Sequence, residues 1–242
     1  MTRDMIANTR VWLKHSQHPL AQFSFKQLKA IRQFNLPKIP LIFDLCYRLW
    51  VFASSVVTAV LRVLWWTPLF RGQTQGTSRR LYLYGGIPLL GEGLVMQIGD
   101  DCRISAHTTF SGRSEQGKPA RLSIGNNVDI GWQCTIAVGT KVTIADNVRI
   151  AQGCFIAGYS GHPLQADLRA AGHAEPAHSR SSVVLERDVW LASKVSVLPG
   201  VTIGQGTVVA TGSIVTRSLP DGVLAAGIPA KVIRKLEDSS NA

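Results

Sequence analysis

An aliphatic residue recurs at every sixth position along several long blocks of the chain, and this period constrains the fold more than any other feature. A weak first block begins at residue 98, and stronger blocks begin at residues 124, 144 and 185. The positions are Ile98, Ile104, Phe110; Ile124, Ile130, Ile136; Ile144, Ile150, Ile156; and Leu185, Leu191, Val197, Ile203, Val209, Val215. Small or β-branched side chains stand four positions after nearly every member, as at Cys134 and Val195.

A period of six fits neither the 3.6-residue turn of an α-helix nor a two-residue strand alternation. It is typical of a parallel solenoid in which three short strands make one coil and each aliphatic residue points to the axis. The sequence therefore predicts a mainly β fold with about five coils. The predicted coils are residues 98–115, 124–141, 144–161, 185–202 and 203–220.

Two segments interrupt the repeat, and loops on a rigid scaffold are common places for functional sites. Residues 112–123 are predicted to be a polar insertion, and residues 162–184 a longer loop rich in His, Ala and Ser. The solenoid domain is expected over residues 81–221. Residues 222–242 leave the repeat and are expected to pack back over the last coil.

The first 80 residues form a separate region that is both basic and apolar. They carry 12 Lys and Arg but 2 acids, a net charge of +10, whereas the whole chain has +11. An amphipathic helical stripe is followed by the helix breakers Pro37 and Pro40. The members of the stripe are Phe23, Phe25, Leu28, Ile31 and Phe34, with Lys26, Lys29 and Arg32 between them.

The stretch Leu41–Trp66 is strongly apolar, and its uninterrupted part, Leu49–Leu61, has 13 residues. A simple membrane span needs about 20 residues, so an in-plane membrane helix is favoured over a span. The alternative is an ordinary helical domain packed on the solenoid. Basic residues mixed with apolar ones suit anionic lipid better than nucleic acid. We therefore expect a cytoplasmic protein that is peripheral on the inner face of the cytoplasmic membrane.

The four cysteines, Cys46, Cys102, Cys134 and Cys154, form no CxxC pair and have no metal-site spacing. They are interpreted as reduced, buried small residues of a cytosolic protein. The polar start, Met1–Arg10, does not have the pattern of a signal peptide.

Several motifs resemble one enzyme family. The loop begins with Ser160–Leu164 (SGHPL) and continues to Asp167–Arg169. Downstream come Leu191–Gly204, Thr211–Pro220 and Ala225–Arg234. Over roughly residues 95–236 the chain resembles the galactoside and maltose O-acetyltransferases and the polysaccharide O-acetyltransferases, which are hexapeptide-repeat proteins. The resemblance implies a left-handed parallel β-helix, a homotrimer, acetyl-CoA as co-substrate and a saccharide acceptor between neighbouring solenoids.

The resemblance also implies a set of site residues. His162 takes the place of the catalytic base, and Trp190 matches a tryptophan beside the site. The contacts to coenzyme A are implied at Ser193, Thr211, Thr216, Arg217, Lys231 and Arg234. The chain differs at Thr211, where relatives carry Ala or Gly. It differs again at Gly131 and Gly139, where relatives carry a sugar-contacting Asn and Asp, so a larger acceptor is expected.

Histidine suits this chemistry, because a sugar hydroxyl is scarcely ionised at pH 7 and a positioned base must take its proton during attack. A backbone N–H at the solenoid edge is expected to stabilise the developing oxyanion. His107, His173 and His178 are more simply interpreted as structural or solvated residues. A zinc site needs three converging ligands, and only His107 and His162 stand at suitable solenoid positions, so no metal is expected.

Two functions stay open. The first is an O-acyltransferase that uses acyl-CoA to modify a surface polysaccharide or lipid-linked glycan. The second is a non-catalytic trimeric scaffold at the membrane. Binding of coenzyme A would separate them.

Overall fold

The structure of this protein is a computed structural model that describes residues 2–113 and 117–236, and it divides into two compact units, residues 1–54 and 55–242. In the first unit lie α1 (Thr2–His15), α2 (Pro19–Gln33) and the first part of α3 (Pro40–Leu61). The predicted amphipathic stripe lies on α2 and just beyond its end, and the helix break falls before Pro40 as predicted.

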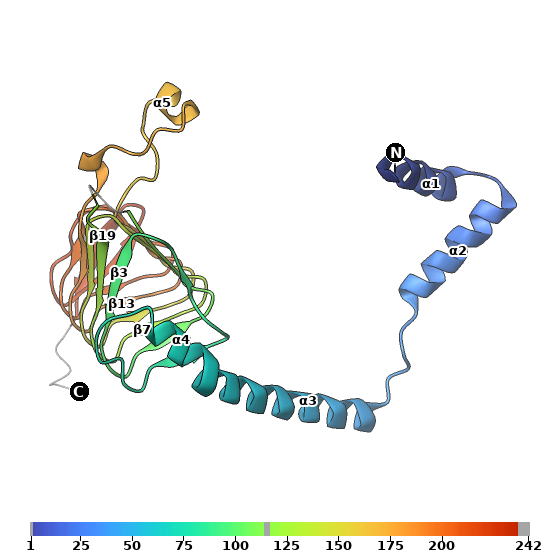
Figure 1. Ribbon diagram of the computed structural model, residues 1–242, viewed down its shortest axis with the longest axis horizontal. Helices are drawn as coiled ribbons and strands as arrows, with labels where there is room; N and C mark the ends of the chain where they lie inside the picture. The colour runs from blue at the N-terminus through green and yellow to red at the C-terminus, as the bar shows by residue number, and fades with distance from the viewer. Residues whose placement is uncertain (1, 114–116, 237–242) are drawn as a thin grey trace. The chain divides into compact units, whose positions relative to one another are not determined.

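Three sheets of parallel strands form most of the second unit, and the chain visits them in turn (Figure 1). Sheet A contains β3 (Leu94–Ile98), β6 (Ala120–Ile124), β9 (Lys141–Ile144), β12 (Val183–Leu185) and β15 (Thr202–Ile203). Sheet B contains β1 (Tyr82–Tyr84), β4 (Arg103–Ser105), β7 (Asp129–Ile130), β10 (Arg149–Ile150), β13 (Trp190–Leu191), β16 (Val208–Val209), β18 (Val223–Gly227) and β19 (Ala230–Lys235). Sheet C contains β2 (Leu89–Leu90), β5 (Thr109–Gly112), β8 (Thr135–Val138), β11 (Phe155–Ala157), β14 (Ser196–Val197) and β17 (Ile214–Val215).

The repeated aliphatic residues form the core of this β-helix. In sheet B, for example, Ile104, Ile130 and Ile150 pair in register and are almost fully buried. The same holds for Ile98, Ile124 and Ile144 in sheet A. The six-residue period is therefore confirmed as the repeat of a parallel β-helix, while its left-handed winding stays a prediction.

The solenoid is longer than predicted, with six strands in sheet C instead of five coils. The first coil begins near Leu83 and passes through Leu90 before it reaches Ile98. These intervals are seven and eight residues because the corners are irregular. Gly85 and Gly86, at the first corner, both have positive φ, which glycine adopts readily. Because of this irregular spacing, the strict six-residue period does not extend to the first coil.

The predicted polar insertion over residues 112–123 is wrong in its bounds. Residues Ala120–Ile124 form strand β6, whose Leu122 and Ile124 are buried in the core. The loop is restricted to residues 113–119, of which 114–116 lie outside the described residues. Polar residues flank this strand, so its alternation of buried and exposed side chains was not recognised in the sequence.

One long helical segment joins the two units, since α3, the π-helical turn η1 (Arg62–Trp66) and α4 (Thr67–Arg71) follow without a break. Over Pro40–Arg71 it is long and apolar enough to cross a membrane, and its most apolar window is not buried. It is thus longer than the 13-residue apolar core suggested.

Cys46 on α3 is exposed, which corrects the expectation that all four cysteines are buried. Cys102, Cys134 and Cys154 are buried and free.

The end of this segment is part of the solenoid unit. Phe70 is 1% exposed and belongs to the hydrophobic core. The Arg62 guanidinium lies 4.1 Å from the centre of the Tyr82 ring, a cation–π contact with the first strand. The compact unit therefore begins within the predicted 1–80 segment.

The C-terminal segment continues the solenoid before it turns back. Strand β18 pairs in parallel with β16, which places Ala225 beside Val209. Strand β19 then runs antiparallel to β18. Residues 223–227 therefore extend sheet B, and β19 folds back on them.

Candidate functional site

The largest described departure from the coils is the loop of residues 158–182, which carries α5 (Ala166–Ala170) and the short 3-10 helix η2 (Ala177–Ser179) (Figure 1). It leaves where the chain passes from sheet C to sheet A, an edge that we call the C–A corner. The long loop predicted over residues 162–184 is present, but it begins directly after β11 and ends before Val183, the first residue of β12. It contains the SGHPL motif. Successive segments at the C–A corner are residues 91–93, 113–119, 139–140, 158–182, 198–201 and 216–218.

His162 has an exposed side chain on a backbone that is held from both sides. The Ser160 hydroxyl donates to the His162 carbonyl at 3.1 Å and lies 3.3 Å from the Ser179 hydroxyl oxygen. On the other side, the Arg169 guanidinium donates to the carbonyl of buried Pro163 at 3.0 Å. The loop therefore fixes the main chain at His162 and leaves the imidazole open to solvent, as a base that must reach a substrate requires.

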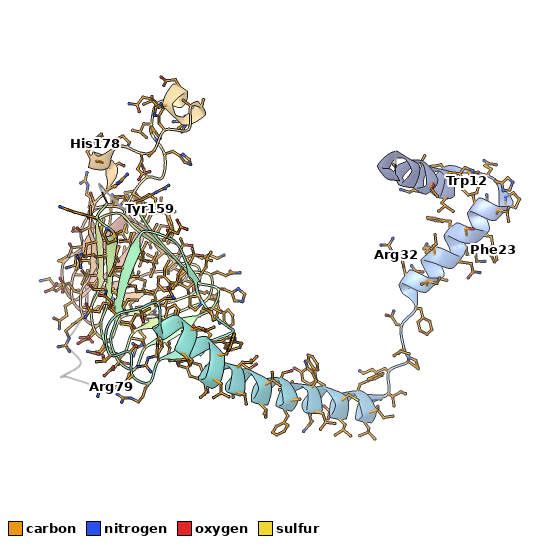
Figure 2. All side chains as sticks on the ribbon, in the orientation of Figure 1. Trp12, Phe23, Arg32, Arg79, Tyr159 and His178 are labelled. Atoms are coloured by element: carbon orange, nitrogen blue, oxygen red, sulfur yellow. The ribbon has the colours of Figure 1, made fainter. Side chains whose placement is uncertain are left out.

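A buried carboxylate, Glu175, anchors the same loop. Its side chain has no exposed surface, and its Oε1 accepts from Arg180 Nε at 3.0 Å. The guanidinium of Arg113, from the C–A corner two coils earlier, lies 3.7 Å from this oxygen and also packs over the Tyr159 ring at 5.2 Å. Figure 2 shows Tyr159 and His178 at the edge from which the loop leaves. The cluster links both ends of the loop to the solenoid.

The other carboxylate oxygen of Glu175, Oε2, is buried and has no hydrogen-bond partner among the described residues. Sequence reasoning missed Glu175 and its arginines. Glu175 is one of two acids in this loop, with Asp167, and nothing in the sequence places Arg113 beside it.

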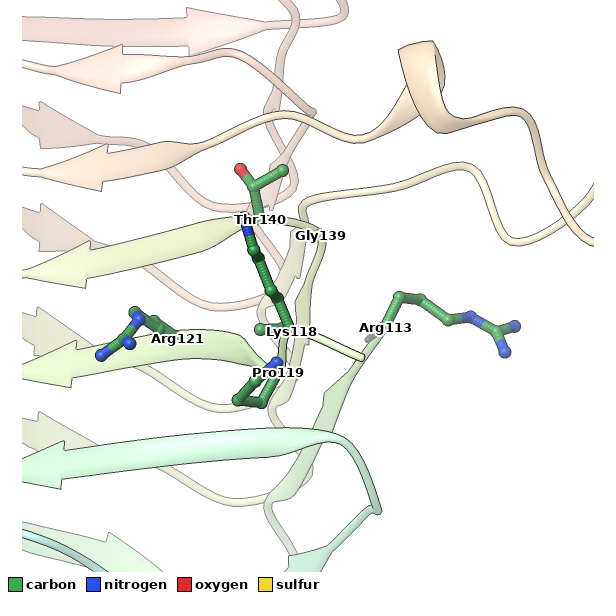
Figure 3. Close-up of a pocket in the computed structure, with 7 residues that line it drawn as sticks. Arg113, Lys118, Pro119, Arg121, Gly139 and Thr140 are labelled. Carbon is green, nitrogen blue, oxygen red and sulfur yellow. The ribbon is translucent and has the colours of Figure 1, made fainter. Parts of the chain in front are cut away.

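A basic hollow of about 290 Å³ lies on the C–A corner, on the second and third coils. Its lining residues are Arg113, Lys118, Pro119, Ala120, Arg121, Gly139 and Thr140. Figure 3 shows Lys118 extending toward Thr140, with Arg113 and Arg121 pointing to opposite sides. A Cβ at Gly139 would come within 2.0 Å of the Gly158 carbonyl oxygen, so only glycine fits here. The absence of an acceptor-contacting Asp at this position therefore has a steric reason.

The remaining histidines do not converge with His162. His107 packs against Trp132, with ring centres 5.1 Å apart, near the corner between sheets B and C. His173 and His178 are exposed in the 158–182 loop. Within residues 2–113 and 117–236, no group of three or more His, Cys, Asp or Glu could hold a metal ion.

The residues implied for coenzyme A lie on the last two coils and on β19. Ser193 and Thr211 stand at the corner between sheets B and C, where Gly212 N donates to Ser193 O at 2.9 Å. Thr216 and Arg217 follow β17 at the C–A corner, and both are exposed. Trp190, on β13, is 50% exposed, and Lys231 and Arg234 are exposed on β19. The structure therefore distributes these residues over two corners and one sheet, and a single chain does not gather them into one pocket.

The fold and this site define a class of protein: a parallel β-helix that carries a long loop with an exposed histidine, His162, at one corner. No protein-family model matches the chain. It is 38% identical over 126 residues to a galactoside O-acetyltransferase of Escherichia coli K12, a match that covers 50% of this chain and 60% of the relative. It is 36% identical over 118 residues to WbbJ of the same strain, named as a lipopolysaccharide biosynthesis O-acetyl transferase, with 47% and 60% covered.

Among solved structures, the chain resembles AntD, an N-acyltransferase from Bacillus cereus bound to dTDP and 3-hydroxybutyryl-CoA. The TM-score is 0.56 at 17% identity, over 71% of this chain and 88% of AntD, so this likeness concerns the fold. The chain spans about 60% of the length of the sequence relatives described above. Over the matched stretch, its solenoid is similar in sequence to the galactoside O-acetyltransferases.

Proposed function

We propose that this protein is an O-acyltransferase that moves an acetyl group from acetyl-CoA to a saccharide hydroxyl, with His162 as general base. The observation that carries the proposal is the SGHPL loop, held by Ser160, Arg169 and Glu175 so that an exposed imidazole stands on a rigid solenoid. The relatives named for galactoside and lipopolysaccharide acetylation support the reaction class.

In the proposed reaction, His162 takes the proton of the acceptor hydroxyl as its oxygen attacks the thioester carbonyl of acetyl-CoA. The carbon–oxygen bond forms, the carbon–sulfur bond breaks, and the departing thiolate of coenzyme A takes the proton from His162 to become the free thiol. The exposed cations Arg217, Lys231 and Arg234 would donate to the phosphates of coenzyme A, because charge-assisted hydrogen bonds to phosphate are among the stronger polar contacts.

We further propose a homotrimer. The residues implied to bind coenzyme A occupy different corners of one solenoid. Neighbouring solenoids in a trimer would bring them together in a shared cleft. Light scattering in mild detergent tests this, and a monomer that still turns over substrate would contradict it.

The saccharide is proposed to be a surface polysaccharide or a lipid-linked glycan unit at the inner face of the cytoplasmic membrane. The unburied apolar helix Pro40–Arg71 supports this location, since it would hold the enzyme close to such an acceptor.

The test is to incubate purified protein with acetyl-CoA and a panel of saccharides, and to measure free thiol and product mass together. We expect thiol release that depends on a saccharide and a product heavier by one acetyl group. A protein that neither binds coenzyme A nor transfers an acetyl group would instead favour the non-catalytic scaffold.

A further inference from the structure

The basic hollow and the histidine loop share one edge of the solenoid in a definite order. Along the C–A corner come the hollow on the second and third coils, the 158–182 loop on the fourth, and Thr216 and Arg217 on the sixth. Neighbouring strands of a sheet lie about 4.8 Å apart, so the hollow is roughly 5 to 10 Å along the axis from the base of the loop. That interval is the size of a sugar ring.

Contacts also connect residues that line the hollow with the ends of the 158–182 loop. The Thr140 hydroxyl lies 3.3 Å from the Ser182 hydroxyl, and Ser181 N donates to Gly158 O at 2.8 Å. Arg113 connects the opposite rim to Glu175 within the loop. A group bound in the hollow would therefore lie directly beside the segment that carries His162.

The described lining of the hollow is basic. Of the seven lining residues that the structure describes, three are cations and none is an acid. For Lys118 and Arg121, no ion pair occurs within the part of the chain that the structure describes. Lys141 stands next to Arg121 in sheet A and is exposed, which adds a fourth cation nearby. Gly139 keeps the floor free of side-chain atoms.

We propose that this hollow binds an anionic group of the acceptor, so that the enzyme selects an acidic saccharide or a glycosyl phosphate over a neutral sugar. Lys118, which extends across the hollow, would make the central charge-assisted contact, with Arg121 at its rim. The acceptor hydroxyl would then lie toward the histidine loop, and acyl-CoA would approach from the side of Thr216 and Arg217. This inference rests on the proposed function for the assignment of the ligand as the acceptor.

The test measures binding to the full-length protein, which keeps it separate from the test of acetyl transfer. The probes are an oligogalacturonate, the same oligomer with its carboxylates reduced to alcohols, and galactose 1-phosphate. Wild-type protein should bind at least one charged probe about 10-fold or more tightly than the reduced oligomer, as expected for a hydrogen bond to a charged group. A preference for the oligogalacturonate points to a sugar carboxylate, and one for galactose 1-phosphate to a phosphate.

The variants are Lys118→Gln alone and Lys118→Gln with Arg121→Gln, both at exposed positions on which the core does not depend. The double variant should bind charged and reduced probes nearly equally, with affinity for coenzyme A unchanged. The matched control, Arg187→Gln with Lys194→Gln, removes the same charge from other corners and should keep the discrimination. Discrimination that survives the double variant would overturn the proposal. Wild-type protein that binds neither charged probe more tightly than the reduced oligomer, or loss of coenzyme A affinity in the double variant, would do so too.

Discussion

At the scale of single residues, Glu175 is a fully buried carboxylate in a largely exposed loop, where it holds Arg180 and faces Arg113. Replacing Glu175 with Gln removes the charged partner of its 3.0 Å ion pair with Arg180, whose side chain is only 11% exposed. Breaking a buried ion pair by removing one member is destabilising, so we expect the loop to open locally. Because small misplacements of a base are costly, turnover should fall by about 10- to 100-fold.

Hydrogen exchange and turnover together measure this effect. Peptides from 158–182 should lose protection in Glu175→Gln while the solenoid strands keep theirs. The control is Glu186→Gln, an exposed carboxylate on the next coil. Unchanged loop protection and unchanged turnover in Glu175→Gln would show that the cluster does not position the loop.

Arg217 and Lys231 are exposed cations that, in the proposed complex, meet phosphates remote from the thioester. Removing a contact made equally in the ground state and the transition state raises KM and leaves kcat nearly unchanged. We expect Arg217→Ala and Lys231→Ala to raise the KM for acetyl-CoA by about 10-fold each, as for a lost charged hydrogen bond. Steady-state kinetics decide this, and a lower kcat at constant KM would place these residues at the chemistry.

At the scale of elements, Asp100 ties the segment after α4 to the solenoid. It accepts from Thr77 Oγ1 at 2.6 Å, from Arg79 N at 2.8 Å and from Arg79 Nε at 2.8 Å. The Thr77 hydroxyl first, and then the Arg79 backbone amide, lower the pKa of Asp100 to about 2. Because the folded-state pKa is lowered, the stabilisation is complete above the ordinary carboxyl pKa, near 4, and is lost as the pH falls toward 2.

Thermal unfolding at pH 6 and at pH 2.5 tests this link. Asp100→Asn should lower the Tm at pH 6, and the difference from wild type should shrink markedly at pH 2.5. A difference of the same size at both pH values would mean that the charge of Asp100 is not what stabilises the segment.

The strands of the solenoid were the most predictable elements, because a buried axial residue at every sixth position depends on local spacing alone. The sequence repeat by itself places Ile130, Ile150 and Leu191 in adjacent coils, and their pairing in sheet B confirms this. The first coil could not be predicted, because its corners at Gly85–Gly86 and residues 91–93 change the spacing.

In the site, the position of the SGHPL loop was predictable. The contacts of Glu175 were not, since they join segments 62 residues apart, at Arg113 and Glu175.

At the scale of the whole molecule, the unburied helix Pro40–Arg71 is expected to hold the protein on a membrane. Phe52 and Val56 are exposed one turn apart on α3, so Phe52→Glu with Val56→Glu places two charges in the apolar stretch without touching the core. Wild-type protein should float with liposomes of anionic lipid, and the variant should float much less. A matched change, Leu164→Glu, alters an exposed apolar residue of the loop and should leave flotation intact. Wild-type protein that ignores liposomes would contradict the membrane location.

Acetyl transfer by His162 is the central claim, and the kinetics of His162→Ala test it most directly. Turnover of acetyl-CoA with the saccharide acceptor should fall by about 100- to 10,000-fold, the range expected for a lost general base. Coenzyme A affinity should stay within about twofold, because the imidazole is exposed and the loop is held by Ser160 and Arg169. His178→Ala, an exposed histidine of the same loop, should retain turnover. A His162→Ala protein that keeps more than about a tenth of wild-type turnover would contradict the account.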